Sequence, residues 1–238
     1  MTVRRVGLLG GTFDPIHMGH LDLASCAQSA LALTQVLVIP ANVPPHRAKP
    51  MTSAFHRFAM VALSVEGRPR WRASDIELRH EAPSYTATTL KRFRERGYQP
   101  GELFFLIGAD AFAEIATWRD SPQLLDRAHF AVVSRPRFPV SDLAGRLPAL
   151  ADRMIAATPG FAPPAAPSII LIDGVTADVS STAIRGRLSR GDSIEGMVDE
   201  RVRQHIEQHG LYRSSSPDRR AAAVPDDAAA GRLHGQNH

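Results

Sequence analysis

Short apolar runs alternate with amphipathic segments along most of this chain. Several runs, such as residues 36–39 and 169–172, are continuously apolar, which is typical of strands that a parallel sheet buries on both faces. The pattern predicts six strands, and each is followed by turn residues or by a helical pattern. We place them at residues 4–9, 35–40, 71–78, 103–108, 129–134 and 168–173.

Apolar residues at helical spacing fill the segments between these strands. They predict helices at residues 19–33, 53–65, 85–96, 109–116, 180–190 and 197–209. The alternation predicts a Rossmann-like α/β fold, in which an open, mostly parallel sheet carries helices on both faces. Ligands of such sheets bind at the carboxyl ends of the strands, so the segments that follow the strands are the first place to look for chemistry.

The composition changes after residue 212. Residues 213–238 contain mainly Ser, Pro, Arg, Asp and Ala and almost no large apolar side chains, so we expect a disordered tail behind one folded domain at residues 1–212. No run approaches about 18 apolar residues, the length that a membrane helix needs. The single cysteine, Cys26, excludes an internal disulfide, and no signal peptide is evident. These features favour a cytoplasmic protein with no membrane partner.

The chain is basic, with a formal net charge of +4 at pH 7. The charge comes from arginines scattered along the sequence, because Lys49 and Lys91 are the only lysines. No basic stripe interleaved with aromatic residues occurs, so we predict no nucleic-acid partner. A modest positive charge also suits an enzyme whose substrates are polyanions.

The most informative segment, residues 10–20, reads GGTFDPIHMGH and lies between the first strand and the first helix. Its glycines let the backbone approach a ligand, and free N–H groups at a helix start suit phosphate. His17 and His20 share one side of a helical turn and could pair on a metal, but no further ligand at suitable spacing is evident, so we assign no metal site. Donation to phosphate oxygens fits these histidines better.

A second motif, VSSTAIR at residues 179–185, opens a later helix. Ser180 is an N-cap candidate, and capping alone could explain the hydroxyl groups. Together with Ser181 and Arg185, the same helix start also makes an anion site from N–H groups, hydroxyls and a guanidinium.

The two motifs resemble the Gly-x-Phe-x-Pro-x-His-x-Gly-His and Ser-x-Thr-x-x-Arg signatures of the nucleotidylyltransferase superfamily. Met18 departs from the Asn that often stands at this variable position. Further segments narrow the resemblance to bacterial nicotinate-nucleotide adenylyltransferases over residues 3–212: PANVPPHR at 40–47, PSYT at 83–86, IGAD at 107–110, TW at 117–118 and SRP at 134–136.

The resemblance implies adenylyl transfer from ATP, accompanied by Mg²⁺, to nicotinate mononucleotide, with release of pyrophosphate, as a step of NAD biosynthesis. It implies that the catalytic residues are His17, His20 and Arg185. The ATP-binding residues that it implies are Gly10, Gly11, Thr12, Phe13, His17, His20, Asp110, Ser180, Ser181 and Arg185. The substrate-binding residues that it implies are Thr12, Arg47, Tyr85, Thr86, Trp118 and Arg135.

Other functions remain open at this point. An adenylyltransferase of the same fold could act on nicotinamide mononucleotide or on phosphopantetheine, although the segments around Tyr85 and Trp118 favour a pyridine nucleotide. A non-catalytic nucleotide or nucleic-acid binder is a further alternative, against which both histidines and Arg185 argue. The sequence is compatible with a homo-oligomer and does not decide the oligomeric state.

Overall fold

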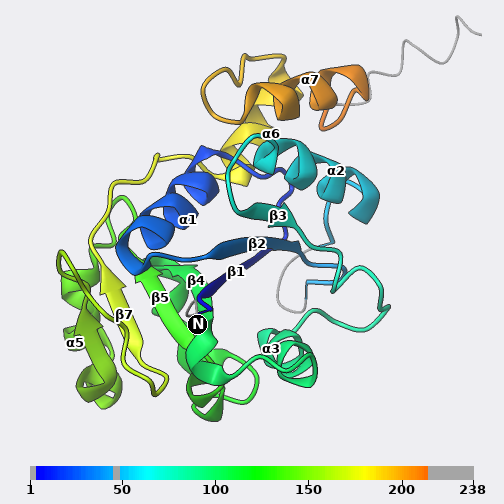
Figure 1. The fold of residues 1–238 in the computed structure, drawn as a ribbon. Helices are drawn as coiled ribbons and strands as arrows, with labels where there is room; N and C mark the ends of the chain where they lie inside the picture. Colours follow the sequence, from blue (N-terminus) through cyan, green and yellow to red (C-terminus); the bar gives the residue numbers. More distant parts are fainter. Residues whose placement is uncertain (1–3, 45–48, 214–238) are drawn as a thin grey trace, which may run out of the picture.

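The computed structural model describes residues 4–44 and 49–213. Its centre is a seven-stranded sheet in the order β3-β2-β1-β4-β5-β7-β6, and every neighbouring pair is parallel. The predicted Rossmann-like fold class is therefore confirmed (Figure 1). The strands are β1 (Val6–Gly11), β2 (Gln35–Pro40), β3 (Trp71–Ala73), β4 (Leu103–Gly108), β5 (His129–Val133), β6 (Met154–Ala156) and β7 (Ile169–Ile172).

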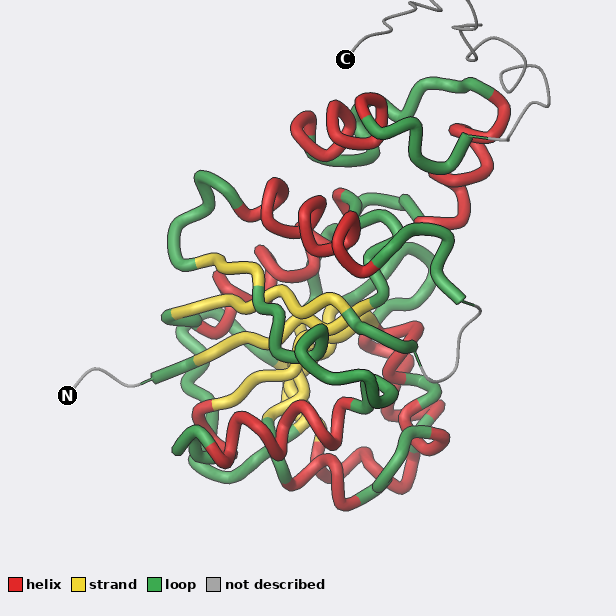
Figure 2. Tube along the Cα trace, turned by 90° about the vertical axis from the view of Figure 1, so that its right-hand side faces the viewer, coloured by secondary structure: helices red, strands yellow, loops and turns green. Residues whose placement is uncertain are grey.

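Helices cover both faces of this sheet, as Figure 2 shows. The first apolar cluster joins one face to α1 (Met18–Leu31), α2 (Ala54–Val65), α6 (Ser181–Arg190) and α7 (Glu200–Gln208). The second joins the other face to α3 (Thr86–Glu95), α4 (Ala109–Phe112) and α5 (Leu143–Arg146). Short 3-10 turns lie at Pro100–Glu102, Ile115–Thr117, Gln123–Asp126, Val140–Asp142 and Pro148–Arg153.

Alternation along β4 shows why the strand sequences are continuously apolar. Phe104 and Leu106 pack in the cluster with α1, whereas Phe105 and Ile107 pack in the cluster on the opposite face. Successive side chains of a strand point to opposite faces, so a sheet covered on both faces must be apolar at every position.

Four sequence predictions are wrong in extent. The first strand, expected at residues 4–9, is Val6–Gly11, because Gly10 and Gly11 still pair with β2 and so belong to the strand rather than to a turn after it. The strand expected at residues 71–78 ends at Ala73, because pairing with β2 stops there and the chain turns at Asp75, whose carbonyl accepts from the Arg79 N–H. The helix expected at 109–116 breaks after Phe112 into a separate 3-10 turn. The last helix begins at Glu200 rather than at residue 197, because the Asp199 carboxylate caps it by accepting from the Arg201 N–H.

The strand order reverses between β1 and β4, which places the usual ligand crevice of such sheets at their carboxyl ends. The predicted site segments follow the ends of β1, β2, β3, β4, β5 and β7 and therefore share one edge of the sheet. Arg47 and the expected disordered tail beyond Arg213 lie outside the described residues. Within the described part of the chain, no helix is long and apolar enough to cross a membrane.

Candidate active site

Residues 12–17, here called the signature loop, connect β1 to α1. Phe13 lies in this loop with φ of 51° and is buried, and its ring meets the His20 ring edge-on at 5.0 Å between centroids. A Cβ at position 11 would lie 2.8 Å from the Phe13 ring, so Gly11 allows the aromatic ring to fold back under the strand end. The glycine and the aromatic of the motif thus shape one turn.

The two histidines of the signature stack at the N-terminus of α1, with ring centroids 3.6 Å apart. The backbone N–H of His17 donates to Nδ1 of His20 at 3.2 Å. Because Nδ1 accepts, a neutral His20 ring carries its proton on Nε2 and can donate from that side. The helix N-terminus adds a partial positive charge, so this end of α1 suits an anion.

His17 is only 3% exposed, and burial, with the charge of Arg135 as a smaller cause, lowers its pKa from 6.5 to about 3. The ring is therefore neutral at pH 7. Its buried Nδ1 has no hydrogen-bond partner among the residues that the structure describes. A buried polar atom without a partner is costly, and a bound oxygen ligand could satisfy it.

The start of α6 binds the signature loop directly. The Ser181 hydroxyl donates to the carbonyl of Pro15 at 2.9 Å, and Nη1 of Arg185 donates to the carbonyl of Asp14 at 2.8 Å. Ser180 caps the helix by accepting from the Ala183 N–H, which confirms the predicted cap. The fold therefore brings the two sequence motifs together, although 166 and 171 residues separate the bonded pairs.

Arg135, which follows β5, lies between the same two motifs. Its guanidinium donates to the carbonyl of Gly19 at 3.1 Å and to the carbonyl of Val179 at 3.4 Å. A Cβ at position 19 would lie 2.7 Å from Nη1 of Arg135, so the glycine between the two histidines makes room for this side chain. A Cβ on Gly108 would meet both Arg135 and the Asp110 carboxylate, which places Asp110 beside the same group.

The residues expected to bind the pyridine part form a second group. Tyr85 stands at the N-cap position of α3 without a capping side-chain hydrogen bond, and Thr86 is the first residue of that helix. The Arg119 guanidinium lies 4.6 Å from the centre of the Tyr85 ring. Trp118, next to Arg119, meets Phe105 edge-on. Tyr85 and Trp118 therefore occupy one neighbourhood.

This second group is joined to the loop that follows β2. The Asn42 N–H donates to the Ser84 hydroxyl, and the Ser84 N–H donates to the carbonyl of Val43. The paired loops end at the segment that contains Arg47, whose placement the structure does not describe.

Sequence reasoning missed the buried supports behind the signature loop. The Asp14 carboxylate accepts from the Met51 N–H at 2.7 Å, from the Thr52 hydroxyl at 2.7 Å and from the Tyr212 hydroxyl at 2.8 Å. Burial and the Asp14 charge raise the pKa of Tyr212 far above its usual value, so the phenol stays protonated and donates. Asp14 lies inside the recognised motif, but Tyr212 is 198 residues away.

Arg57 of α2 is the other missed support. Its side chain is 1% exposed, and it donates to the carbonyls of Thr12, Ala41 and Asn42. Burial lowers its pKa, and the charge of Asp14 opposes that effect. The only sequence signal was an arginine within an otherwise apolar helical pattern, which is rare unless the charge is paired.

A family model described as cytidylyltransferase-like matches residues 8–187. A probable nicotinate-nucleotide adenylyltransferase of Roseiflexus sp. (strain RS-1) is 40% identical over 215 residues, which cover 90% of this chain and 100% of that protein. The nicotinate-nucleotide adenylyltransferase of Salmonella typhimurium (strain LT2) is 36% identical over 207 residues, which cover 87% of this chain and 97% of that protein.

Solved structures agree in fold. The nicotinic acid mononucleotide adenylyltransferase of Plasmodium falciparum complexed with NaAD has a TM-score of 0.67 at 18% identity, and the match covers 88% of this chain and 97% of that chain. At that identity the likeness supports the fold alone, whereas the family model and the curated relatives carry the assignment. The chain belongs to the cytidylyltransferase-like family and, within it, to the nicotinate-nucleotide adenylyltransferases.

Proposed function

We propose that this chain transfers the adenylyl group of ATP to nicotinate mononucleotide, giving nicotinate adenine dinucleotide and pyrophosphate in NAD biosynthesis. One observation carries the proposal: the stacked pair His17–His20 and the start of α6 meet on the same signature loop. Two relatives that are 40% and 36% identical to this chain are named for the same activity.

The reaction is an in-line displacement at phosphorus. An oxygen of the mononucleotide phosphate forms a bond to the α-phosphorus of ATP, and the bond from that phosphorus to the bridging oxygen of the β-phosphate breaks. Pyrophosphate leaves with the electron pair of that bond. The protein then acts by positioning the reactants and neutralising charge, with no covalent enzyme intermediate.

His17 and His20 act on the α-phosphate and the departing pyrophosphate. Both lie at the N-terminus of α1, where neutral rings can donate an N–H to phosphate oxygens. The low pKa of His17 means that it donates as a neutral imidazole before ligand arrives. A polyanion beside it favours the protonated ring, so binding of ATP should raise this pKa.

Arg185, Ser180 and Ser181 hold the β- and γ-phosphates. Nη1 of Arg185 is taken by the Asp14 carbonyl, and a guanidinium carries further N–H donors that can reach a phosphate. Residues 10–13 contribute backbone contacts along the end of β1. Arg135 supplies positive charge beside the histidines and, with Arg47, binds a substrate phosphate.

Asp110 is an exposed carboxylate at the end of β4, beside Arg135. Oxygen ligands of this kind suit Mg²⁺, which usually keeps several waters and binds one or two carboxylates together with substrate phosphates. Asp110 therefore fits a magnesium ion that arrives with ATP, whose chemistry is to neutralise phosphate charge. The carboxylate can also accept from a ribose hydroxyl.

The nicotinate ring is placed against Trp118, whose half-buried face offers an aromatic surface for stacking. The N–H groups at the start of α3, where Thr86 follows the N-cap residue Tyr85, are donors for the carboxylate of the nicotinate ring. An amide in place of the carboxylate would lose the charge that this helix terminus favours, so the proposal includes preference for the acid.

The test is pyrophosphate release from ATP and Mg²⁺ with three acceptors in parallel, namely nicotinate mononucleotide, nicotinamide mononucleotide and phosphopantetheine. Strong release with the first alone, with the dinucleotide identified by mass, supports both reaction and substrate. Release with another acceptor overturns the substrate, and no release with any acceptor overturns the reaction and leaves a nucleotide-binding protein.

A further inference from the structure

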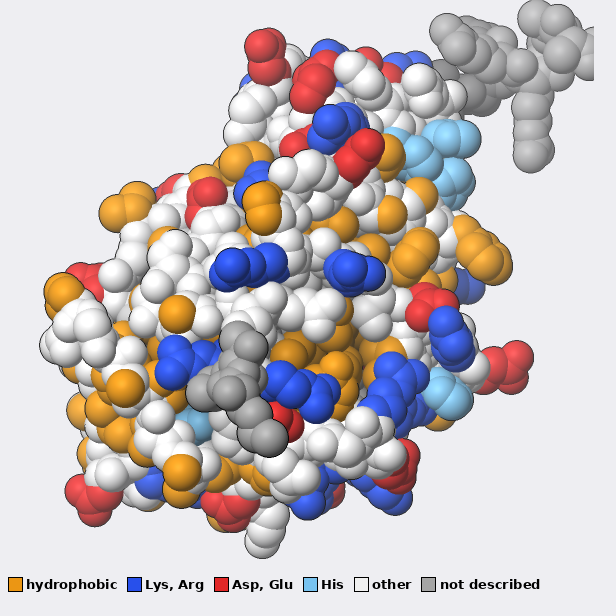
Figure 3. All heavy atoms as spheres, in the orientation of Figure 1, with side chains coloured by type: hydrophobic (Ala, Val, Ile, Leu, Met, Phe, Trp, Pro, Cys, Tyr) orange, Lys and Arg blue, Asp and Glu red, His pale blue; other side chains and the backbone are white. Residues whose placement is uncertain are grey.

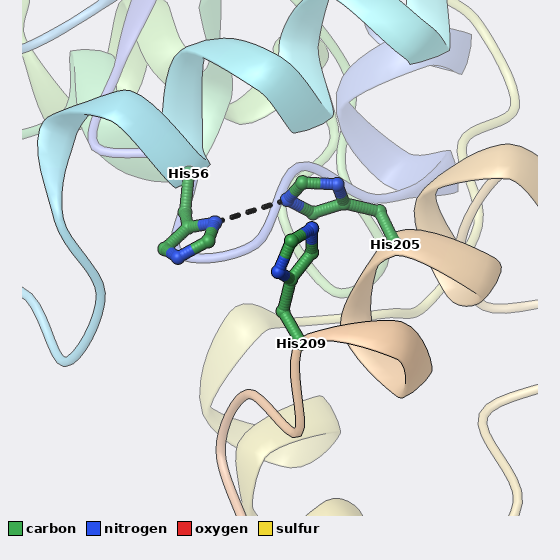
Figure 4. Close-up of side chains that lie close together, drawn as sticks. All are labelled: His56, His205 and His209. Atoms are coloured by element: carbon green, nitrogen blue, oxygen red, sulfur yellow. Dashed lines mark hydrogen bonds between the residues drawn. The ribbon is translucent and has the colours of Figure 1, made fainter.

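A cluster of three histidines lies apart from the residues placed in catalysis. His56 belongs to the first turn of α2, His205 to α7, and His209 follows directly at the end of α7 (Figure 4). Figure 3 shows histidine side chains gathered at the surface between α2 and α7. His56 and His205 are half-buried and His209 is exposed, so the cluster is open to solvent on one side.

The rings face one another closely enough to share an ion. Nδ1 of His56 and Nε2 of His205 share a hydrogen bond of 3.1 Å, which a bound ion would replace, and one nitrogen from each of the three rings lies within 4.8 Å of the other two (Figure 4). Tetrahedral zinc binds imidazole nitrogen at about 2.0–2.1 Å, which implies roughly 3.3 Å between neighbouring ligand atoms. One pair already meets this separation, and side-chain rotation of the exposed His209 can close the remaining gap.

The spacing on α7 supports the same chemistry. His205 and His209 are four residues apart, which places two rings on one helix face, the spacing by which zinc is bound in helical His-x-x-x-His pairs. The third histidine comes from a different element, so the cluster joins α7 to α2. Three imidazoles with a water in the fourth position form a common zinc coordination set.

We propose that His56, His205 and His209 bind one divalent transition-metal ion, with Zn²⁺ as the best fit, and that the ion fastens α7 to α2. Imidazole nitrogens suit Zn²⁺ and disfavour Mg²⁺, which prefers oxygen ligands. The ion is distinct from the magnesium that accompanies ATP.

The site connects to the signature loop through both helices. His56 precedes Arg57, which holds the carbonyl of Thr12, and His209 stands three residues before Tyr212, which donates to Asp14. A metal bridge between the helices would therefore stabilise the buried side of the signature loop without touching substrate. This makes the ion a structural support rather than a catalytic one.

The experiment measures metal binding to the full chain without an affinity tag. The protein is stripped with a chelator, dialysed, and titrated with Zn²⁺ by calorimetry, and its melting temperature is followed with and without the ion. Co²⁺ replaces Zn²⁺ in a parallel titration, in which visible absorption reports ligand number and geometry. His209→Gln removes an exposed ligand with little risk to folding, and His56→Gln removes the ligand on the other helix.

His80→Gln is the matched control, because His80 is also exposed and is not part of the cluster. We expect one equivalent of Zn²⁺ and a raised melting temperature in the wild type and in the control. Each ligand variant should bind at least about 10–100-fold more weakly, the range that changes to outer-shell partners alone produce. The proposal is overturned if the wild-type protein binds no equivalent of Zn²⁺, or if His209→Gln binds Zn²⁺ as tightly as the wild type.

Discussion

On one side of the signature loop, α6 presents Ser181 and Arg185; on the other, α2 and the segment after α7 present Arg57 and Tyr212. On the first side, Ser181 and Arg185 are half-exposed, and each donates one hydrogen bond to a carbonyl of the loop. The second side is buried: Arg57 donates to the carbonyl of Thr12, and Tyr212 donates to the Asp14 carboxylate. The same six residues are thus held by groups that can still reach a ligand and by groups that cannot.

This difference explains which residues a sequence motif reveals. The residues that we propose to bind ligand stand in short local patterns, as in GGTFDPIHMGH and SSTAIR. The buried supports are single residues whose partners come from distant parts of the chain, so no local pattern marks them. The comparison predicts that changes on the buried side reduce stability, whereas changes on the exposed side reduce turnover.

The largest expected effect on the buried side comes from Arg57→Met. The change removes a buried charge and leaves the carbonyls of Thr12, Ala41 and Asn42 without their donors. A buried acceptor left without its donor costs about 1–3 kcal/mol, so with three carbonyls affected the free energy of unfolding should fall by about 3 kcal/mol or more. Urea denaturation measures it. A fall below about 1 kcal/mol would show that the loop does not need this support.

On the exposed side, His20→Ala should lower kcat by about 10²–10³, the usual result of losing one donor to a charge that develops in the transition state. The KM for ATP should change much less, and the free energy of unfolding should change by less than about 1 kcal/mol. Steady-state kinetics and urea denaturation on the same preparation separate the two effects. Normal turnover in this variant would remove His20 from the chemistry.

Acid should lower the free energy of unfolding through His17, the last residue of the signature loop. Its folded pKa of about 3 lies below the unfolded value of 6.5, so between these values the unfolded chain binds more protons. Stability is therefore full above pH 6.5 and falls as the pH drops toward 3. Between pH 6.5 and pH 5 the loss from this group is about 2 kcal/mol at about 1.4 kcal/mol per unit.

His17→Asn is the variant that isolates the acid effect. His129, whose pKa is lowered to about 4 by burial, gives a similar acid loss and is present in both proteins, so it cancels in the comparison. The wild type should lose about 2 kcal/mol more than the variant over this pH range. Parallel pH curves for the two proteins would contradict a neutral, buried His17.

The smallest effect is expected for Tyr212→Phe, which keeps the ring and removes one donor to Asp14. Asp14 retains Met51 and Thr52, so the loss should be about 1.5 kcal/mol, the low end for a hydrogen bond to a charged group. Removal of residues 213–238, which spares Tyr212, is the matched control and should leave stability and activity intact. Thermal unfolding of both proteins tests the boundary expected after residue 212.

Much of the fold follows from the sequence, because residues buried on both faces leave an apolar run that few other structures produce. The runs at residues 35–40 and 103–108 are strands with those bounds. The short edge strand β6 was missed, since it is three residues long and two of them are exposed. Strand β3 was predicted to be longer than it is. Ile76 is apolar and buried in the core, but it lies in the turn that follows the strand.

The half of the candidate site that we propose to bind ligand was predictable from the sequence, and the buried half was not. His17, His20, Ser181 and Arg185 could be named from spacing, and the structure brings them to one loop. Tyr212 could not be named as a partner of Asp14, because one hydrogen bond over 198 residues leaves no periodic signal. The three-histidine cluster was missed for the same reason, since two helices far apart in sequence supply its members.

The most direct test of this division is a paired measurement on Arg185→Ala, with turnover and free energy of unfolding taken from the same protein. Arg185 donates to a carbonyl of the loop and is also the residue that we propose to bind the phosphates, so both roles can be measured in one residue. We predict that kcat/KM for ATP falls at least about tenfold while the free energy of unfolding changes by less than about 1 kcal/mol. Full activity with a large loss of stability would place Arg185 among the supports and contradict the account.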